Sequence, residues 1–269
     1  MALADLDEYV ALERDPPWRV PFFKVALATT AGRLADSWTT AGPAGTAPTT
    51  AVAPTDATAG AIGADMLANL SMTKRILGAN LSSNQAGTFF LCDRLSHQGG
   101  LSGIVTGVVT TNLPTAALTR YTSGEGVRIA LSIYTLIGST ATTVTVTYTN
   151  QAGTGSRVTP ATVLGGTGFR EAARFLVLPL QAGDTGVRSV ESINVVATTG
   201  TAGAFGVTLF KPIAAYVIER PGGQQRFNLV DGMGGLLHDI EANACLFFAY
   251  SSAGASTVLA GNLHIAEAT

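Results

Sequence analysis

The chain has 269 residues, a formal net charge of −2 and only 13% charged residues. Soluble domains usually carry about 25% charged residues, so we expect much of this surface to be covered by other subunits. A near-neutral chain has no general attraction for phosphate backbones or anionic membranes, which argues against nucleic-acid and membrane partners. The mean hydropathy is +0.32, but Gly, Thr and Ser interrupt every apolar run before it reaches membrane-spanning length.

Residues 1–72 differ in character from the rest, and we expect an N-terminal helix followed by an extended arm or linker. Apolar residues recur at helical spacing over residues 3–10 behind an acidic first turn, and Pro16-Pro17 ends this short helix. After an apolar stretch at 20–28, residues 39–63 set prolines among Ala, Thr and Gly with almost no charge. Such a segment cannot bury enough surface to fold alone, so we expect a mobile linker or an arm ordered on a neighbouring surface.

From about residue 73 the sequence changes to short β-branched runs separated by Gly, Asn and Pro. The clearest is 144–149, where strict alternation puts Val144, Val146 and Tyr148 on one face and threonines on the other. Residues 150–155 supply a turn and 157–163 a returning strand. This pattern predicts a β-hairpin.

Residues 127–137 alternate as well. Val127, Ile129, Leu131 and Ile133 are expected on one side, and Arg128, Ala130, Ser132 and Tyr134 on the other. Further strand candidates are 88–92, 104–111, 174–180, 187–197, 204–210, 213–219, 244–250 and 257–265.

About a dozen evenly spaced strands without an amphipathic helix between them predict an all-β fold. We expect an antiparallel, jelly-roll-like β-sandwich over residues 73–269, preceded by the extended N-terminal arm over residues 1–72. Charged residues, the usual protection of edge strands, are scarce in this chain. The edges of the sandwich are therefore expected to pair or pack in an assembly.

Catalytic and cofactor motifs such as GxSxG, HExxH, Walker A and GxGxxG do not occur in the sequence. His238 lies beside Asp239 and Glu241, but a lone histidine near carboxylates is more often a solvated loop than a metal site. We therefore expect no enzyme activity, no catalytic residues, no cofactor and no metal. Cys92 and Cys245 each lie in an apolar run without a CxxC partner, which predicts buried free thiols.

The basic residues are nearly all arginine, with lysine only at Lys24, Lys74 and Lys211. Protein interfaces are enriched in arginine and depleted in lysine, so this ratio favours a subunit of an assembly. A genome of high GC content would produce the same ratio without any interface.

Several turn and strand strings carry a family resemblance. They are residues 93–103 (DRLSHQGGLSG), 144–153 (VTVTYTNQAG) and 187–193 (VRSVESI), with 244–246 and 261–263 near the end of the chain. These strings resemble structural proteins encoded in the morphogenesis regions of tailed bacteriophages, and the likeness runs from about Phe22 to the C-terminus. The resemblance implies a virion component, a capsid decoration or cement protein bound to the outside of the phage head. It supplies no catalytic residues.

The expected partners are the major capsid protein or other virion subunits, together with further copies of this chain. The first residues lack the basic and apolar stretches of a secretion signal, so we expect synthesis in the host cytoplasm before incorporation into the virion. Contacts are expected from arm aromatics and from arginines at the sandwich edges: Trp18, Phe22, Phe23, Trp38, Arg128 and Arg157.

The alternative function is a receptor- or glycan-binding module of a head fibre or tail. A glycan site normally presents several exposed aromatic side chains. Aromatic residues make up 7% of this chain, and both tryptophans, Trp18 and Trp38, fall in the predicted arm. The sandwich is therefore poorly equipped for stacking on sugars.

Overall fold

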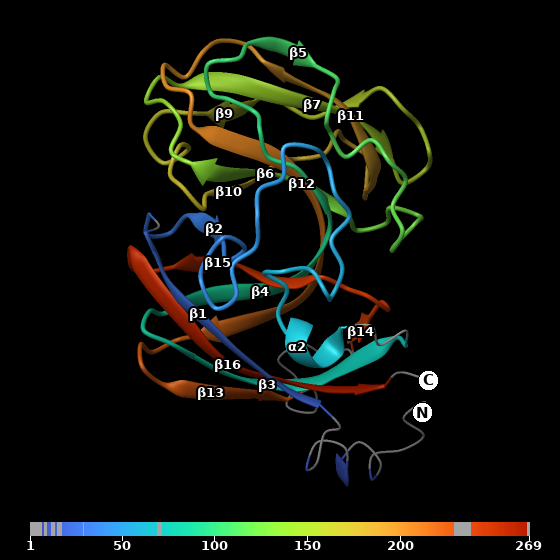
Figure 1. Ribbon diagram of the computed structural model, residues 1–269, viewed down its shortest axis with the longest axis vertical. Coiled ribbons are helices and arrows are strands. Elements are labelled where there is room, and N and C mark those ends of the chain that lie inside the picture. The colour runs from blue at the N-terminus through green and yellow to red at the C-terminus, as the bar shows by residue number, and fades with distance from the viewer. Residues whose placement is uncertain are drawn as a thin grey trace.

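The protein is built of antiparallel β-sheets stacked along its long axis (Figure 1). The computed structural model describes residues 7, 10, 11, 14, 18–28, 30–68, 72–228 and 238–267. Every strand pairing in these ranges is antiparallel, so the predicted all-β, antiparallel sandwich is confirmed. No described helix has the length and apolar character that crossing a membrane requires.

Three sheets make up the fold. The lower sheet of Figure 1 contains, in spatial order, β1 (Trp18–Ala28), β16 (Ser256–Glu267), β3 (Lys74–Ser83) and β13 (Gln224–Asn228), and β14 (His238–Ile240) also pairs with β3. The central sheet contains β10 (Phe175–Val177), β6 (Arg128–Thr135), β12 (Ala204–Ile218), β4 (Gly87–His97), β15 (Leu246–Ser252) and β2 (Leu34–Asp36). The upper sheet contains β5 (Gly107–Val109), β11 (Val187–Val195), β7 (Thr142–Asn150) and β8 (Arg157–Val158), and β9 (Thr162–Leu164) also pairs with β7.

The central sheet curls into a nearly closed barrel. A bridge between Ala35 and Arg174 joins its two outer strands, β2 and β10, and the Asp36 amide donates to the Ala173 carbonyl at 2.9 Å. The barrel interior is filled by a cluster that includes Phe175, Phe210 and Phe247. Because the two outer strands meet, the central sheet leaves little open edge.

Two long strands connect the lower and upper halves of the molecule. Along β12, Phe205, Val207 and Leu209 lie in the core beneath the upper sheet, whereas Tyr216 and Ile218 lie in the core above the lower sheet. The neighbouring strand β4 pairs with β12 from Gly87 to His97. Both cores are therefore built on the same strands.

The predicted hairpin is confirmed in the upper sheet. β7 pairs with β8 and β9, and Val144, Val146 and Tyr148 have no exposed surface. The threonines between them are partly exposed. The alternation predicts this strand well because one face lies in the core and the other faces solvent.

The alternation along β6 predicts one of the two faces of this strand correctly, but not the other. Ile129, Leu131 and Ile133 are buried in the upper core, as predicted. Ala130 and Ser132, expected on the opposite side, are buried as well because that side faces the barrel interior. Their small side chains leave room for the aromatic rings of the barrel interior, and the Ser132 hydroxyl lies 2.9 Å from the Thr208 hydroxyl.

Residues 18–68 do not extend away as an arm. β1 pairs with β16 and β2 with β15, so the sheets cross the expected boundary at residue 72. The loop between β2 and the short helix α2 (Ala64–Leu67) runs across the front of the molecule (Figure 1) and pairs with the end of β4 through Val52 and His97. Most of residues 1–17 lie outside the described residues, and the four described there have helical backbone.

Buried ion pairs explain why this segment folds onto the sheets. Asp36 and Asp56 come from the segment 18–68, and each pairs with a basic residue of a later strand. The three fully buried pairs are Asp36 with Arg94, Asp56 with Lys74 at 3.6 Å, and Asp93 with Arg120 at 2.9 Å. A buried charge is strongly unfavourable unless it is paired or hydrogen-bonded, so each aspartate holds its segment against the basic residue that pairs with it.

Arg94 is the most heavily contacted of these residues. Its guanidinium lies between the rings of Trp38 and Phe247, 4.6 Å and 4.4 Å from their centroids. It also donates to the Thr208 hydroxyl at 3.2 Å and to the Asp36 carboxylate. Cation–π contacts are strongest when the cation is desolvated, as here.

The two cysteines are buried free thiols, as predicted. Both belong to the cluster that fills the barrel. Burial raises the pKa of Cys245 to about 12 and raises that of Cys92 as well. Neither thiol is reactive at neutral pH.

Replacing Asp36 with Ala is expected to destabilise the fold by about 3–5 kcal/mol, because it leaves the Arg94 charge buried without its partner. Urea unfolding followed by circular dichroism measures the change. The matched control is Asp239→Ala, which breaks the half-exposed pair with Arg75 and is expected to change stability by no more than about 1 kcal/mol. Equal effects of the two substitutions would contradict this account of the segment.

Candidate binding surface

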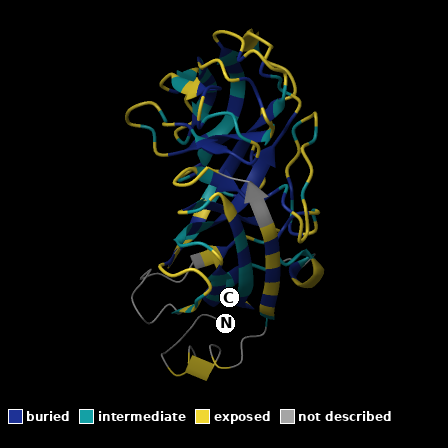
Figure 2. Ribbon diagram, turned by 90° about the vertical axis from the view of Figure 1, so that its left-hand side faces the viewer, coloured by how far each residue is buried: buried dark blue, intermediate teal, exposed yellow. Residues whose placement is uncertain are grey.

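Three of the six residues expected at an interface lie on β1, an edge strand of the lower sheet. Its side chains alternate, with Phe22 buried and Phe23 53% exposed, and Trp18 partly exposed at its start. Figure 2 shows this alternation along the strand that leads from the N-terminus. Of these three, Phe23 is therefore the residue most available to a partner.

Trp38 is not a surface residue. It has no exposed area, its indole Nε1 donates to the Thr46 carbonyl at 2.8 Å, and its ring contacts Arg94. Gly45 packs so closely on the indole that a Cβ there would lie 2.1 Å from the ring. The expectation that Trp38 contacts another subunit is therefore corrected: it belongs to the core of this chain.

Arg128 and Arg157 lie in the upper half and both bind the loop between β10 and β11. Arg157 pairs with Asp184 at 2.9 Å, and Arg128 donates to the Thr185 carbonyl at 3.1 Å. Hydrogen bonds from Arg157, Tyr148 and Asn150 lower the pKa of Asp184 to about 2. These arginines hold a loop of their own chain, far along the sequence and the fold from β1.

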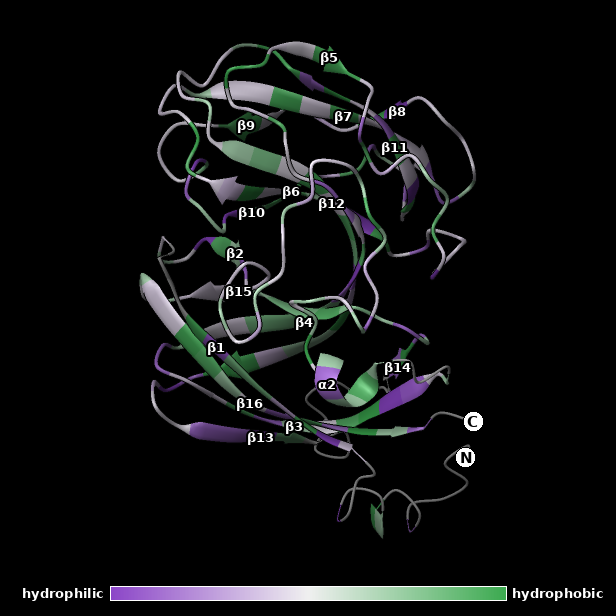
Figure 3. Ribbon diagram, viewed as in Figure 1, coloured by the Kyte–Doolittle hydropathy of each residue, from purple (hydrophilic) through white to green (hydrophobic). Residues whose placement is uncertain are grey.

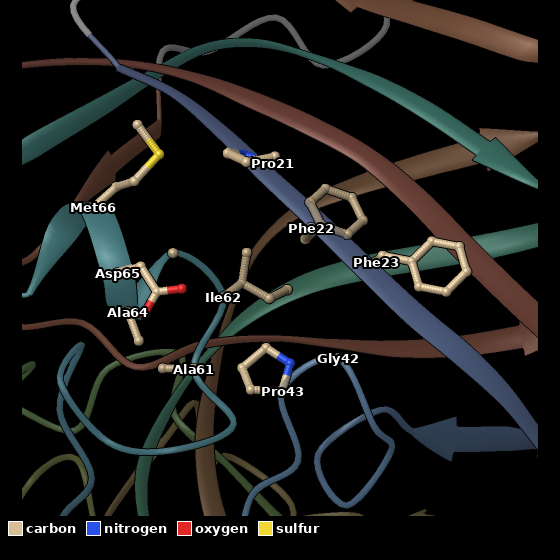
Figure 4. Close-up of a pocket in the computed structure, with 11 residues that line it drawn as sticks. Pro21, Phe22, Phe23, Gly42, Pro43, Ala61, Ile62, Ala64, Asp65 and Met66 are labelled. Atoms are coloured by element: carbon tan, nitrogen blue, oxygen red, sulfur yellow. The ribbon is translucent and has the colours of Figure 1, made fainter.

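A groove of about 370 Å³ lies beside β1 (Figure 4). One wall is β1, and the opposite wall consists of the turn at Gly42 and Pro43 together with α2. The lining side chains are mostly apolar: Pro21, Phe22, Phe23, Pro43, Ala61, Ile62, Ala64, Asp65 and Met66. Asp65 is the charged side chain among them.

The walls of the groove are held at a fixed separation by close backbone contacts. The Val25 amide donates to the Ala41 carbonyl at 3.3 Å. At Gly42, with φ of 98°, a Cβ would lie 1.8 Å from the Phe23 carbonyl oxygen, so only glycine allows the turn to approach β1. The Ile62 amide donates to the Leu246 carbonyl at 2.8 Å, which anchors the other end of the wall.

Lys24 connects β1 to both parts of the opposite wall. Its side chain is 2% exposed and its ammonium group donates to the Pro43 carbonyl and, at 3.4 Å, to the Gly60 carbonyl. Burial lowers its pKa from 10.5 to about 8, while the nearby Asp36 charge opposes the shift. The groove is thus preformed rather than assembled by a ligand.

The rim of the groove exposes apolar surface. Of the residues that line the groove, Phe23 is 53% and Met66 42% exposed. Such a surface suits an apolar side chain of another macromolecule, with the Asp65 carboxylate able to accept a hydrogen bond at one side. The sequence points to Phe23 but not to Met66, because only the fold brings α2 beside β1.

The described residues show no constellation for metal chemistry, since no three His, Cys, Asp or Glu side chains meet among them. His97 lies in the barrel, where its Nδ1 is 3.1 Å from the Tyr134 hydroxyl and 3.4 Å from Arg94. Burial and the Arg94 charge lower its pKa to about 2, so the ring is neutral and Nδ1 accepts from these donors. His97 therefore belongs to the buried network of the barrel.

Comparison with known proteins gives little support for an identity. No protein-family model matches the chain, and no curated protein matches it. Among solved structures, the VP2 subviral particle of infectious bursal disease virus matches weakly, with 8% identity and a TM-score of 0.16, covering 94% of this chain and 82% of that one. A likeness at this level carries no argument.

Lys24 is expected to make stability depend on pH. Between about pH 8 and 10.5 the folded protein binds fewer protons than the unfolded chain, so stability should rise with pH by up to about 3 kcal/mol. Urea unfolding of the wild type and of Lys24→Met at several pH values measures this. The free energy of unfolding of the wild type, relative to that of Lys24→Met, should increase as pH rises. A relative stability that does not depend on pH would show that Lys24 is not held as a buried cation.

Proposed function

We propose that this protein is a non-enzymatic structural component of a virus particle, a capsid decoration protein that attaches through the surface around the β1 groove. The observation that carries the proposal is the exposed apolar surface of Phe23 and Met66 on a preformed groove. An exposed apolar surface on a rigid scaffold is typical of protein interaction sites. Its partner in this proposal is a capsid subunit.

The distribution of charge supports a structural role. Among the described residues, eight charged side chains are buried: Lys24, Asp36, Asp56, Lys74, Asp93, Arg94, Arg120 and Arg174. Because only 13% of the residues are charged and these eight do not reach the surface, the surface carries fewer charges than that of an ordinary soluble domain to keep copies and partners apart. Such a surface suits a protein that functions within an assembly.

The strings that resemble phage structural proteins lie in the framework of the fold. Residues 93–97 end β4 and include Asp93, Arg94 and His97 of the buried network, and 144–150 lie in β7. These residues belong to strands of the framework, and none of them lines the β1 groove. The resemblance therefore supports a shared scaffold, and the attachment surface is proposed from the geometry of β1.

The mode of attachment differs from an arm that bridges capsid subunits. Residues 18–68 are held by buried ion pairs and by strand pairing, so they are not free to extend. Attachment through the folded surface of the lower sheet takes the place of the arm in this proposal.

A receptor- or glycan-binding module has less support. Among the described residues, Phe23 is the one aromatic side chain in the exposed class. Stacking on a sugar usually requires more than a single exposed ring. Phe23 and Met66 both line the same mostly apolar groove, which suits an apolar protein side chain better than a carbohydrate.

Particles of the virus that encodes this chain are expected to contain it in many copies, which quantitative mass spectrometry of gradient-purified particles measures. Phe23→Asp should lower binding to these particles at least about tenfold, because it places a charge in an apolar contact. The control is Val217→Asp on β12, a valine that is 41% exposed and does not line the groove.

Absence of the protein from purified particles would overturn the virion assignment. Equal binding of the Phe23→Asp and Val217→Asp variants would leave the protein in the virion but would exclude the groove as its contact.

A further inference from the structure

The edges of the three sheets differ in how they are protected against pairing with other chains. In the lower sheet β1 contains Pro21 and β13 contains Arg226, and a proline or a charged side chain discourages strand addition. The central sheet closes on itself through Ala35 and Arg174. In the upper sheet β8 is two residues long and carries Arg157. β5, at the opposite edge of the upper sheet, is also short, at three residues, but neither β5 nor the segment around it from residue 99 to 119 contains a charged side chain.

The segment around β5 combines exposure with a strong preference for β-structure. Residues 104–112 read IVTGVVTTN, in which seven of nine residues are β-branched, and no charged residue occurs from 99 to 119. Ile104 is 53%, Val105 47% and Val108 66% exposed. Figure 3 shows hydrophobic residues on β5 at the upper end of the molecule.

One side of β5 is hydrogen-bonded and the other is open. Val108 lies opposite Asn194 of β11, and Val109 opposite Ile193. In the described part of the chain no strand pairs with the outer side of β5. An unprotected edge of this kind is a template for another strand.

We propose that β5 pairs antiparallel with β5 of a second copy across a two-fold axis, so that two upper sheets join into one continuous sheet. Pairing of this kind brings each side chain close to its own counterpart. A charged residue would therefore face its own charge and be repelled. The uncharged segment 99–119 meets this requirement, whereas Arg226 on β13 and Arg157 on β8 would not.

The outer face next to β5 is compatible with this arrangement. Val108, Asn194 and Thr145 form a row across β5, β11 and β7. Val196, just beyond β11, is 63% exposed. The joined sheets would thus present uncharged, mostly β-branched side chains on both sides of the axis, and apolar contacts would add to the main-chain hydrogen bonds.

This inference does not rest on the proposed function. β5 lies at the opposite end of the molecule from β1 and α2 (Figure 1), so the dimer leaves the β1 groove free. Self-association is tested on the isolated protein, and particle binding is tested separately. Failure of one proposal therefore leaves the other standing.

The first test is the mass of the full chain in solution, measured by size-exclusion chromatography with light scattering. The wild type should have twice the mass of one chain, and Val108→Lys should have half the wild-type mass at the same concentration. The matched control is Val158→Lys on β8, a valine that is 45% exposed at the opposite edge of the same sheet and that should leave the dimer intact.

The second test is disulfide cross-linking and does not depend on a disruptive substitution. Single cysteines at Thr106, Val108 and Thr110 should give covalent dimers under oxidation, fastest at the residue nearest the axis, whereas Val158→Cys should not. Cys92 and Cys245 are buried with raised pKa values, so they contribute no background. A monomeric wild type, an unchanged dimer mass for Val108→Lys, or no cross-link at any of the three positions would each overturn the proposal.

Discussion

The fold depends on pairing charges that lie out of reach of water. Asp36 and Asp56 are held by Arg94 and Lys74, and Asp93, next to Arg94 in β4, pairs with Arg120. Arg120 also donates to the Pro54 carbonyl at 2.9 Å and to the Arg94 carbonyl at 3.0 Å, so one guanidinium joins the long loop, β4 and the upper half of the molecule. Because a buried ion without its partner is strongly unfavourable, these contacts specify one position for the loop and thereby close the barrel and form the wall of the β1 groove.

The same constraint shapes the surface. Among the described residues eight charged side chains are buried, so a chain with only 13% charged residues has fewer charges on its exterior than an ordinary soluble protein, and threonine, serine and scattered valines cover much of it. The sparsely charged exterior and the buried ion pairs are thus two results of one distribution. Edges that keep a charge or a proline, such as β13 and β1, stay protected, whereas β5 does not. The dimer that we propose uses β5, the edge without a charge or a proline.

Hydrophobic alternation in the sequence predicts strands that have one buried side and one solvent-facing side. It does not predict strands that are buried on both sides, or segments whose stabilising contacts are with residues far along the chain. β7 was predicted because Val144 and Val146 face a core while the threonines face solvent. On β6, Ala130 and Ser132 look like solvent-facing residues, yet they face the barrel. Residues 39–63 look like a linker because their stabilising contacts are with β4 and β3, and local periodicity carries no signal for partners so far along the chain. The candidate surface shows the same limit: Phe23 is suggested by the sequence, but the groove exists only once α2 lies against β1.

The shared strands β4 and β12 have a mechanical consequence. β12 is 15 residues long, so it extends for about 50 Å, and it pairs with β4 and β6 over nearly all of that length. A force that pulls the lower and upper ends apart acts along these strands. The hydrogen bonds between the strands then bear the load at the same time and do not break one by one. We therefore expect the two halves to move as one body, so that the orientation of one end sets the orientation of the other.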